Sequence, residues 1–597
     1  MDGGATPPAT GPAVLGVERS FTGRRWRPRL ADDRAAFAIA DRLGLPETVA
    51  RVLAARGIDA EGAPRFLAPT LREQLPDPSH LRDMDRAAAR IAAAVQAGEG
   101  IAIFGDYDVD GATTSALLLR FLRAAGARAS VYIPDRIAEG YGPNLPALLK
   151  LKAGGARVVV TVDCGTTAFA PLQGARDAGL DVVVVDHHVA EPALPAAHAV
   201  VNPNRLDEES PHRNLAAVGV GFLLAVAVNR ALRVAGWWRD RPAPDLLGLL
   251  DLVALGTVCD VMPLVGLNRA FVAQGLKVMG TRANAGIAAL ADVARLDERP
   301  GAFHLGYVLG PRVNAGGRVG RADLGARLLA TDDPAEAAAI AAELDRHNEE
   351  RRRLETEALA QASAMVDAEP ALPPVIAIGD AGWHPGVIGI IASRLKDRYG
   401  RPALVMAMAD GVAKGSGRSV PGFDLGAAVI AARQAGILDQ GGGHAMAAGF
   451  ALPAARLEAF RDFLCGRFAA AGLVAGRSPE LGLDGALALS ALRPELVEGL
   501  EAVGPFGTGM PEPRFALGHV RLAFADVVGK VHVRCTLSAP SGERVKAIAF
   551  RAMEGALGPA LLAAAGRSLH VAGRPAIDNW NGGRAVQLRI DDAAPAA

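Results

Sequence analysis

Acidic and imidazole side chains recur directly after short apolar runs that have the length of buried strands or helices. They are Asp106, Asp108, Asp110, Asp163, Asp186, His187, His188 and Asp260. Carboxylates gathered in one crevice repel each other unless a cation neutralises them. Carboxylate oxygens with one or two imidazoles suit Mn²⁺ or Mg²⁺, whereas structural zinc would favour thiolates. If the chain brings these residues together, it holds a site for divalent cations.

The elements that must position them alternate in type. The runs 101–104, 158–162 and 182–185 read as strands, 112–125 reads as a helix, and the apolar helix 246–256 leads to Asp260. Continuous apolar strands separated by helices predict a parallel sheet covered on both faces. Residues that follow such strands converge at the carboxyl edge of the sheet, where these folds bind ligands.

Each residue also has a plainer interpretation. The spacing of the first three aspartates could open an EF-hand loop, but the twelfth position is Leu117, where a glutamate is required. An aspartate after a strand is usually a helix cap, which would explain Asp163 or Asp260 taken alone. Cys164 and Cys259 read as small buried residues. The joint occurrence at four element ends favours the metal site.

The composition excludes several classes of protein. The 597 residues are 50% hydrophobic and 21% charged, with no net charge, which excludes a disordered or collagen-like chain. Nucleic-acid binding would need a local basic groove. Four scattered cysteines without a CxxC pair argue against a disulfide framework and for a reducing, cytoplasmic location. The longest apolar run, 216–228, is too short to span a membrane, and the N-terminus lacks the features of a signal peptide.

The remaining segments predict an α/β protein with two α/β domains joined by a long helix, followed by a C-terminal β-barrel of the OB type. Five strand-like runs with glycine-rich turns after about residue 480 indicate the barrel. The expected boundaries are 1–79 for a tail and small helical cap, 80–330 for the catalytic domain, 331–370 for the helix, 371–475 for the second α/β domain and 476–597 for the barrel.

Eleven motifs resemble the DHH phosphoesterase family, in the family's order. The first block carries GDYDVDG, PDRIAEGYG, VDCG, DHH, GTVCDVMPL and PRVNAGGR. HPGVIGIIASRL, KGSGRSVPGFDL and GGGHAMAAG resemble the family's DHHA1 domain. GPFGTGMPEPRF and the ending NWNGGRAVQLRIDD resemble the OB domain of its exonucleases specific for single-stranded DNA. Met510 stands where asparagine is expected, and Phe104 where some relatives have a histidine that could bind metal.

The resemblance implies a metal-dependent exonuclease that degrades single-stranded DNA from the 5′ end to 5′-mononucleotides in DNA repair and recombination. It implies two cations, Mn²⁺ or Mg²⁺, one held by Asp108 and the other by Asp110, His187 and Asp260, with Asp163 between them. His188 would face the scissile phosphate, and Asp106 would fix the loop. Candidate partners are a helicase and a single-strand-binding protein, and no membrane is implied.

Other residues in the motifs are candidates for holding the DNA. They are Arg136, Arg312, Asn314, Arg318, Ser416, Arg418, Gly442 and His444. Guanidinium groups match phosphate oxygens, and glycine-rich loops let backbone N–H groups approach a phosphate. Because most of the 64 basic residues are arginines, a surface ion pair is the plainer interpretation of each arginine, and a tight turn explains the glycines equally well. Among the few aromatics, Phe506, Phe515 and Trp580 could stack on bases or pack in the core.

Two other functions fit part of the sequence. Relatives that hydrolyse short oligoribonucleotides or cyclic dinucleotides resemble only the first two blocks, so the predicted barrel favours a polymer substrate. Degenerate members of the family act as non-catalytic scaffolds in replication complexes, but they have lost ligand residues. Here the aspartate and histidine set is complete.

Overall fold

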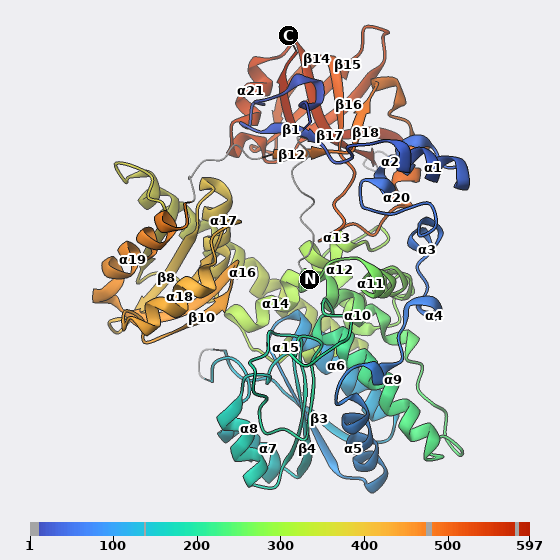
Figure 1. Cartoon of the computed structure of the whole chain (residues 1–597), viewed down its shortest axis with the longest axis vertical. Coiled ribbons are helices and arrows are strands. Elements are labelled where there is room, and N and C mark those ends of the chain that lie inside the picture. Colours follow the sequence, from blue (N-terminus) through green and yellow to red (C-terminus); the bar gives the residue numbers. More distant parts are fainter. Residues whose placement is uncertain (1–10, 137–138, 473–479, 579–583, 597) are drawn as a thin grey trace. The chain divides into compact units, whose positions relative to one another are not determined.

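The computed structural model describes residues 11–136, 139–472, 480–578 and 584–596. It divides into two compact units, which are described separately (Figure 1). One unit comprises Leu75–Met262 and Phe271–Arg477, and the other comprises Met1–Gln74, Pro263–Ala270 and Ser478–Ala597. The first contains both α/β domains and the second contains the barrel.

The first α/β domain is built on a sheet of five parallel strands in the order β3-β2-β4-β5-β6, which confirms the predicted parallel sheet. Helices lie on both faces, with α7 and α8 on one side and α5 and α9 on the other (Figure 1). Valine-rich strands such as β4 are buried because both faces are covered. The bounds are β2 Gly100–Gly105, β3 Arg128–Tyr132, β4 Ala156–Val162, β5 Asp181–Val185, β6 Ala199–Val201, α5 Met84–Ala97, α7 Leu145–Ala153 and α8 Phe169–Asp177.

Helix α6, Val109–Ala124, begins three residues before the predicted start. Asp108 caps it, because the Asp108 carboxylate accepts a hydrogen bond from the N–H of Gly111 at 3.1 Å. Gly111 has to be glycine here, since a Cβ would lie 2.4 Å from the carbonyl oxygen of Asp106. The tight loop between β2 and α6 therefore requires a residue without a side chain at position 111.

The rest of this domain is helical. Helix α9, Ala217–Val234, is the one helix among the described residues that is long and apolar enough to cross a membrane, but 67% of that stretch is buried inside the protein. It packs against α5 and α6 as a core helix. The other elements are α10 Leu250–Cys259, α11 Gly266–Met279, α12 Ala285–Val293, α13 Ala302–His304, the π-helix η4 Leu305–Leu309, α14 Gly310–Val319 and α15 Leu324–Ala330.

The predicted long helix is α16, Pro334–Asp367, which begins at the cap Asp333. It leads to a second α/β domain with strand order β10-β11-β9-β8-β7, in which only β7 and β8 pair in parallel. Its core is built largely from phenylalanine and leucine side chains. The bounds are β7 Ile376–Asp380, α17 Ile388–Tyr399, β8 Ala403–Ala409, β9 Val412–Arg418, α18 Leu425–Gln434, β10 Gln440–His444, β11 Ala447–Pro453 and α19 Leu457–Ala470.

The C-terminal strands form the predicted barrel. The order β14-β15-β16-β18-β17 closes because β14 also pairs with β17. Closure leaves these strands no free edge. The bounds are β13 Gly485–Leu487, α20 Pro494–Glu501, β14 Phe515–Val528, β15 His532–Ser538, β16 Arg544–Ala549, α21 Leu557–Ala563, β17 Ser568–Asp578 and β18 Ala585–Pro595.

The N-terminal segment belongs to the barrel unit, whereas the sequence had set residues 1–79 apart. Strand β1, Arg25–Pro28, pairs in parallel with β12, Glu480–Leu483. Trp26 is fully buried, and its Nε1–H donates to the Asp592 carboxylate at 3.0 Å. The short helices of this segment are α1 Arg34–Leu43, α2 Glu47–Ala54, α3 Ala63–Leu67 and α4 Leu71–Gln74.

Candidate active site

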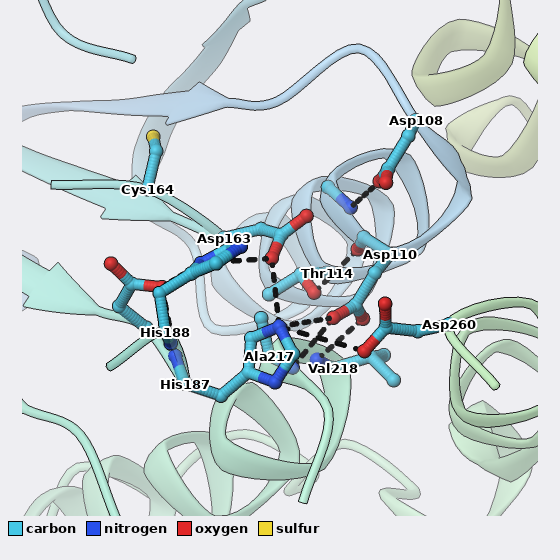
Figure 2. A network of polar contacts seen from close by, with 12 residues as sticks. Asp108, Asp110, Thr114, Asp163, Cys164, His187, His188, Ala217, Val218 and Asp260 are labelled. Atoms are coloured by element: carbon cyan, nitrogen blue, oxygen red, sulfur yellow. Dashed lines mark hydrogen bonds and ion pairs between the residues drawn. The ribbon is translucent and has the colours of Figure 1, made fainter. Parts of the chain in front are cut away.

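The predicted cluster of acids and histidines assembles at the carboxyl edge of the parallel sheet (Figure 2). Three groups have ligand atoms that all lie within 4.8 Å of one another. Two of the groups contain Asp163 and two contain His187, so they form one connected site. The groups are Asp106 with Asp108 and Asp163, Asp110 with His187 and Asp260, and Asp163 with His187 and His188.

His187 lies between carboxylates of three different elements, as Figure 2 shows. Its Nε2 is 3.3 Å from Asp163, 3.5 Å from Asp260 and 3.8 Å from Asp110. Burial, followed by the nearby charge of His188, lowers the pKa of His187 to about 4. The imidazole is therefore neutral at physiological pH, which is the form that binds metal.

Asp110 is held by the start of α9. Its two carboxylate oxygens accept hydrogen bonds from the N–H groups of Ala217 at 2.6 Å and Val218 at 2.9 Å. Close packing of α10 against α6 requires Gly256, whose Cβ would lie 2.4 Å from Thr113. Burial and then the charge of Asp108 raise the pKa of Asp110 to about 7.

Three carboxylates keep a buried oxygen with no hydrogen-bond donor among the described residues: Asp106, Asp163 and Asp260. Burial, and after it the neighbouring carboxylates, raise the pKa of all three, that of Asp260 to about 9. A buried oxygen without a donor is costly unless a cation approaches it. Carboxylate oxygens and one neutral imidazole form a donor set that fits Mn²⁺ or Mg²⁺.

Asp186 organises the turn that carries the two histidines. Its carboxylate accepts from His188 Nδ1 at 2.7 Å and from the N–H groups of His187 at 2.8 Å and Thr166 at 3.0 Å. Burial alone would raise the pKa of Asp186, but the hydrogen bond and charge of His188 outweigh burial and lower it. Burial alone would lower the pKa of His188, but Asp186 outweighs burial there too and raises it. Sequence reasoning placed Asp186 in the cluster without seeing this role.

A second site lies between the two α/β domains of the same unit. It is a cavity of about 320 Å³ whose lining includes Arg136, Arg318, Lys414, Ser416 and Arg418, and no acidic side chain among the described residues. Burial, then Arg136, lowers the pKa of Arg318 to about 10 and also lowers that of Arg418. Arginines that destabilise each other's charge in this way favour a bound anion.

Some predicted DNA-binding residues lie elsewhere. Arg312 does not line this cavity, because its guanidinium donates to Asp345 at 2.8 Å and to the carbonyl of Val308 at 2.7 Å. Asn314 lies in α14, between Arg312 and Arg318. Gly442 and His444 lie on the edge strand β10, where β11 separates them from the strand that carries Ser416 and Arg418.

The two departures from the family's motifs are both accommodated by core packing. Phe104 is fully buried, and its ring lies 5.5 Å from that of Tyr132, so it contributes no ligand to the site. Met510 is buried too, and its backbone closes a turn with Gly507.

The two candidate stacking aromatics that the structure describes are covered, in part or fully. Phe515 is in the core and Phe506 is partly covered, while Trp580 lies outside the described residues. The barrel instead exposes Phe524 and Phe550, at 48% and 55%. Strand alternation would have indicated Phe524 only once the register of β14 was known.

Three family models match the chain. They are the DHH family N-terminal domain at residues 100–257, the DHHA1 domain at 372–470 and the RecJ OB domain at 483–592. The chain is 36% identical to the single-stranded-DNA-specific exonuclease RecJ of Salmonella typhimurium over 588 residues, which is 96% of this chain and 99% of that protein. It is also 36% identical to the Escherichia coli protein of that name, over 92% of this chain and 96% of the relative.

Solved structures similar to this chain come from the same family as its relatives in sequence. The RecJ of Thermus thermophilus in complex with Mn²⁺ superposes with a TM-score of 0.78 at 30% identity, covering 94% of this chain and 78% of that one. The same protein in complex with Mg²⁺ gives a TM-score of 0.74 at 29% identity, covering 95% and 78%.

Proposed function

Because the chain belongs to the RecJ exonucleases of the DHH family, we propose that it hydrolyses single-stranded DNA with two divalent cations, Mn²⁺ or Mg²⁺. It acts stepwise from the 5′ end and releases 5′-mononucleotides. The observation that carries the proposal is the connected set of buried and half-buried carboxylates and histidines, in which three carboxylates retain a buried oxygen with no hydrogen-bond donor among the described residues.

The ligand groups overlap in a way that suits two neighbouring cations. Asp108 and Asp163 would hold one, and Asp110, His187 and Asp260 the other, with Asp163 shared. Asp106 lies in the group with Asp108, its N–H donates to the carbonyl of Val162 at 3.3 Å, and we assign it to fixing the loop after β2. Two such cations, held by these residues, would activate a water molecule and would stabilise the entering and leaving oxygens of an in-line displacement. No serine or cysteine nucleophile is needed.

His188 is the residue we assign to the scissile phosphate. Its ring is 37% exposed and is fixed from behind by Asp186. Burial opposes the charged ring, but the hydrogen bond and charge of Asp186 raise the pKa of His188 and so favour its protonated form. The ring would orient the phosphate or protonate the leaving oxygen.

The cationic cavity would hold the 5′ end of the strand. Arg136 and Arg318 from the first α/β domain and Ser416 and Arg418 from the second meet there. A terminal phosphate carries more charge than an internal diester, so this cavity can distinguish the two. Fixing the end also fixes which diester reaches the carboxylate cluster, and this gives single-nucleotide steps.

The closed barrel favours a polymer over a short oligoribonucleotide or cyclic dinucleotide, because it adds a surface on which a longer strand can lie. The complete ligand set disfavours a non-catalytic scaffold. We place the activity in DNA repair and recombination in the cytoplasm. There a helicase that exposes single strands and a single-strand-binding protein are fitting partners.

The test offers the purified full chain 5′-labelled single strands, duplexes and short RNA, with and without Mn²⁺. We expect label release as mononucleotide from single-stranded DNA alone, abolished by chelation. Preferred cleavage of short RNA would favour the oligoribonucleotide hydrolase instead. Mn²⁺ binding without cleavage of any substrate would favour the scaffold.

A further inference from the structure

Tyr141 contacts the carboxylate cluster from the loop between β3 and α7, which contributes no residue to the three ligand groups. Its hydroxyl oxygen lies 3.0 Å from the carbonyl oxygen of Asp163 and 3.4 Å from Nδ1 of His188. The Tyr141 and His188 rings meet edge to face with centroids 6.0 Å apart. The Tyr141 hydroxyl therefore contacts both Asp163, which two of the ligand groups share, and His188.

Counting donors and acceptors fixes what each atom does. The carbonyl oxygen of Asp163 can only accept, so the single hydroxyl proton of Tyr141 is donated there. His188 Nδ1 lies 2.7 Å from the Asp186 carboxylate, which can only accept, so Nδ1 carries a hydrogen. Since the Tyr141 proton is already donated to Asp163, the phenol oxygen accepts from this same N–H of His188.

The backbone conformation of Asp163 explains why the hydrogen bond from Tyr141 to its carbonyl matters. Asp163 adopts φ 60°, the left-handed region that non-glycine residues seldom occupy. This conformation aims its carboxylate into the cluster, and it is unfavourable for a non-glycine residue unless surrounding contacts hold it. The N–H of Asp163 donates to Val185 at 3.0 Å, and Tyr141 secures the carbonyl on the other side.

We propose that Tyr141 is a positioning residue of the metal centre, whose hydroxyl holds Asp163 in its left-handed conformation and keeps His188 in register with it. The inference rests on the proposed function, and it adds a residue that binds no metal itself. Partners that orient metal ligands commonly contribute about 10- to 100-fold in metal affinity or activity. Tyr141 would act on the strand only through Asp163 and His188.

The test compares Tyr141→Phe, which removes only the hydroxyl oxygen, with Tyr399→Phe as a matched control. Tyr399 also donates a hydrogen bond, to Asp367 at 2.7 Å, but it lies in the second α/β domain away from the cluster. For the full-length wild type and each variant, the measurements are the Kd for Mn²⁺ by calorimetry, kcat and KM on 5′-phosphorylated single strands, and the thermal midpoint.

For Tyr141→Phe we expect Mn²⁺ binding about 10-fold weaker and, at saturating Mn²⁺, kcat about 10-fold lower, with KM and thermal midpoint unchanged. Tyr399→Phe should match the wild type in Mn²⁺ affinity and kcat. Wild-type values for Tyr141→Phe would overturn the inference, as would a lower thermal midpoint with normal Mn²⁺ affinity. If the wild type cleaves no strand while Tyr141→Phe still weakens Mn²⁺ binding, the proposed function fails and the positioning role stands.

Discussion

The substitution Arg418→Ala tests whether the cationic cavity reads the 5′ end. Arg418 is well placed for this, because its Nη1 donates to Ser416 Oγ at 3.1 Å and to the carbonyl of Gly417 at 2.8 Å. These contacts fix the guanidinium before any substrate arrives, and no acidic side chain among the described residues lining the cavity competes for it.

The size of the effect follows from the charge of the ligand. A charge-assisted hydrogen bond to a phosphate contributes about 1.5–3 kcal/mol, which corresponds to about 10- to 150-fold in kcat/KM. Arg136 and Arg318 remain in the variant, so binding of the terminal phosphate weakens without being lost. A strand that ends in a 5′-hydroxyl offers no such charge, and its loss should be several-fold smaller.

The assay measures kcat/KM for 5′-phosphorylated and 5′-hydroxyl strands of the same sequence, with wild type, Arg418→Ala and a control. Arg398→Ala is the matched control, because Arg398 pairs with Asp367 on the surface of the same domain. Equal losses on the two strands would refute the reasoning. They would show that Arg418 grips the strand and that its end is sensed elsewhere.

Three further predictions concern the metal centre, the barrel and a buried acid. Asp163→Asn should abolish turnover and weaken Mn²⁺ binding while the circular dichroism spectrum stays unchanged; unimpaired cleavage in metal-buffered solution would contradict a shared ligand. A chain restricted to residues 75–477 should still bind Mn²⁺ but bind long single strands with a shallower dependence of log K on log salt, because fewer phosphates are neutralised; an unchanged slope would give the barrel another role. Burial raises the pKa of Asp251 from its ordinary value of about 4 to about 6, so the free energy of unfolding falls as pH rises between these two values and stays lowered above them. Asp251→Asn should therefore raise the free energy of unfolding by about 1–3 kcal/mol at pH 8 but have little effect at pH 3.5, and denaturant titrations showing the same difference at both pH values would contradict this.

The boundaries of the shortened chain in the second of these predictions follow from the structure rather than from the sequence. Ending the chain near residue 475 would leave β1 without β12 and would expose Trp26. The matched comparison therefore removes the N-terminal segment together with the barrel and keeps Pro263–Ala270, which groups with the barrel but connects the two parts of the first unit. Nothing in the local sequence of residues 25–28 or 480–483 indicates that these two segments pair as parallel strands.

The arginines show where residue type stops being informative. Arg312, Arg318 and Arg418 all lie in motifs, yet Arg312 is paired with Asp345 while the other two line the cavity. The arginine side chain is long and flexible, so its guanidinium can contact several neighbours. Which partner it pairs with depends on which elements pack beside it in the folded protein. Tyr141 was overlooked for a similar reason, since a tyrosine in a glycine-rich loop gives no sign of the carbonyl that its hydroxyl will meet.

The sequence by itself determined the parallel sheet, the closed barrel and the acids and histidines that meet in the candidate active site. Strand periodicity is local, and every parallel strand delivers the residue after it to the same edge, so the convergence of Asp106, Asp163 and His187 follows from connectivity. Asp260 follows a helix, and its approach to the same edge depends on how that helix packs. Tertiary structure decided the left-handed backbone of Asp163, the choice among the arginines and the union of the N-terminal strand with the barrel. Each of these depends on contacts between segments far apart in the chain, whose geometry only the packed fold supplies.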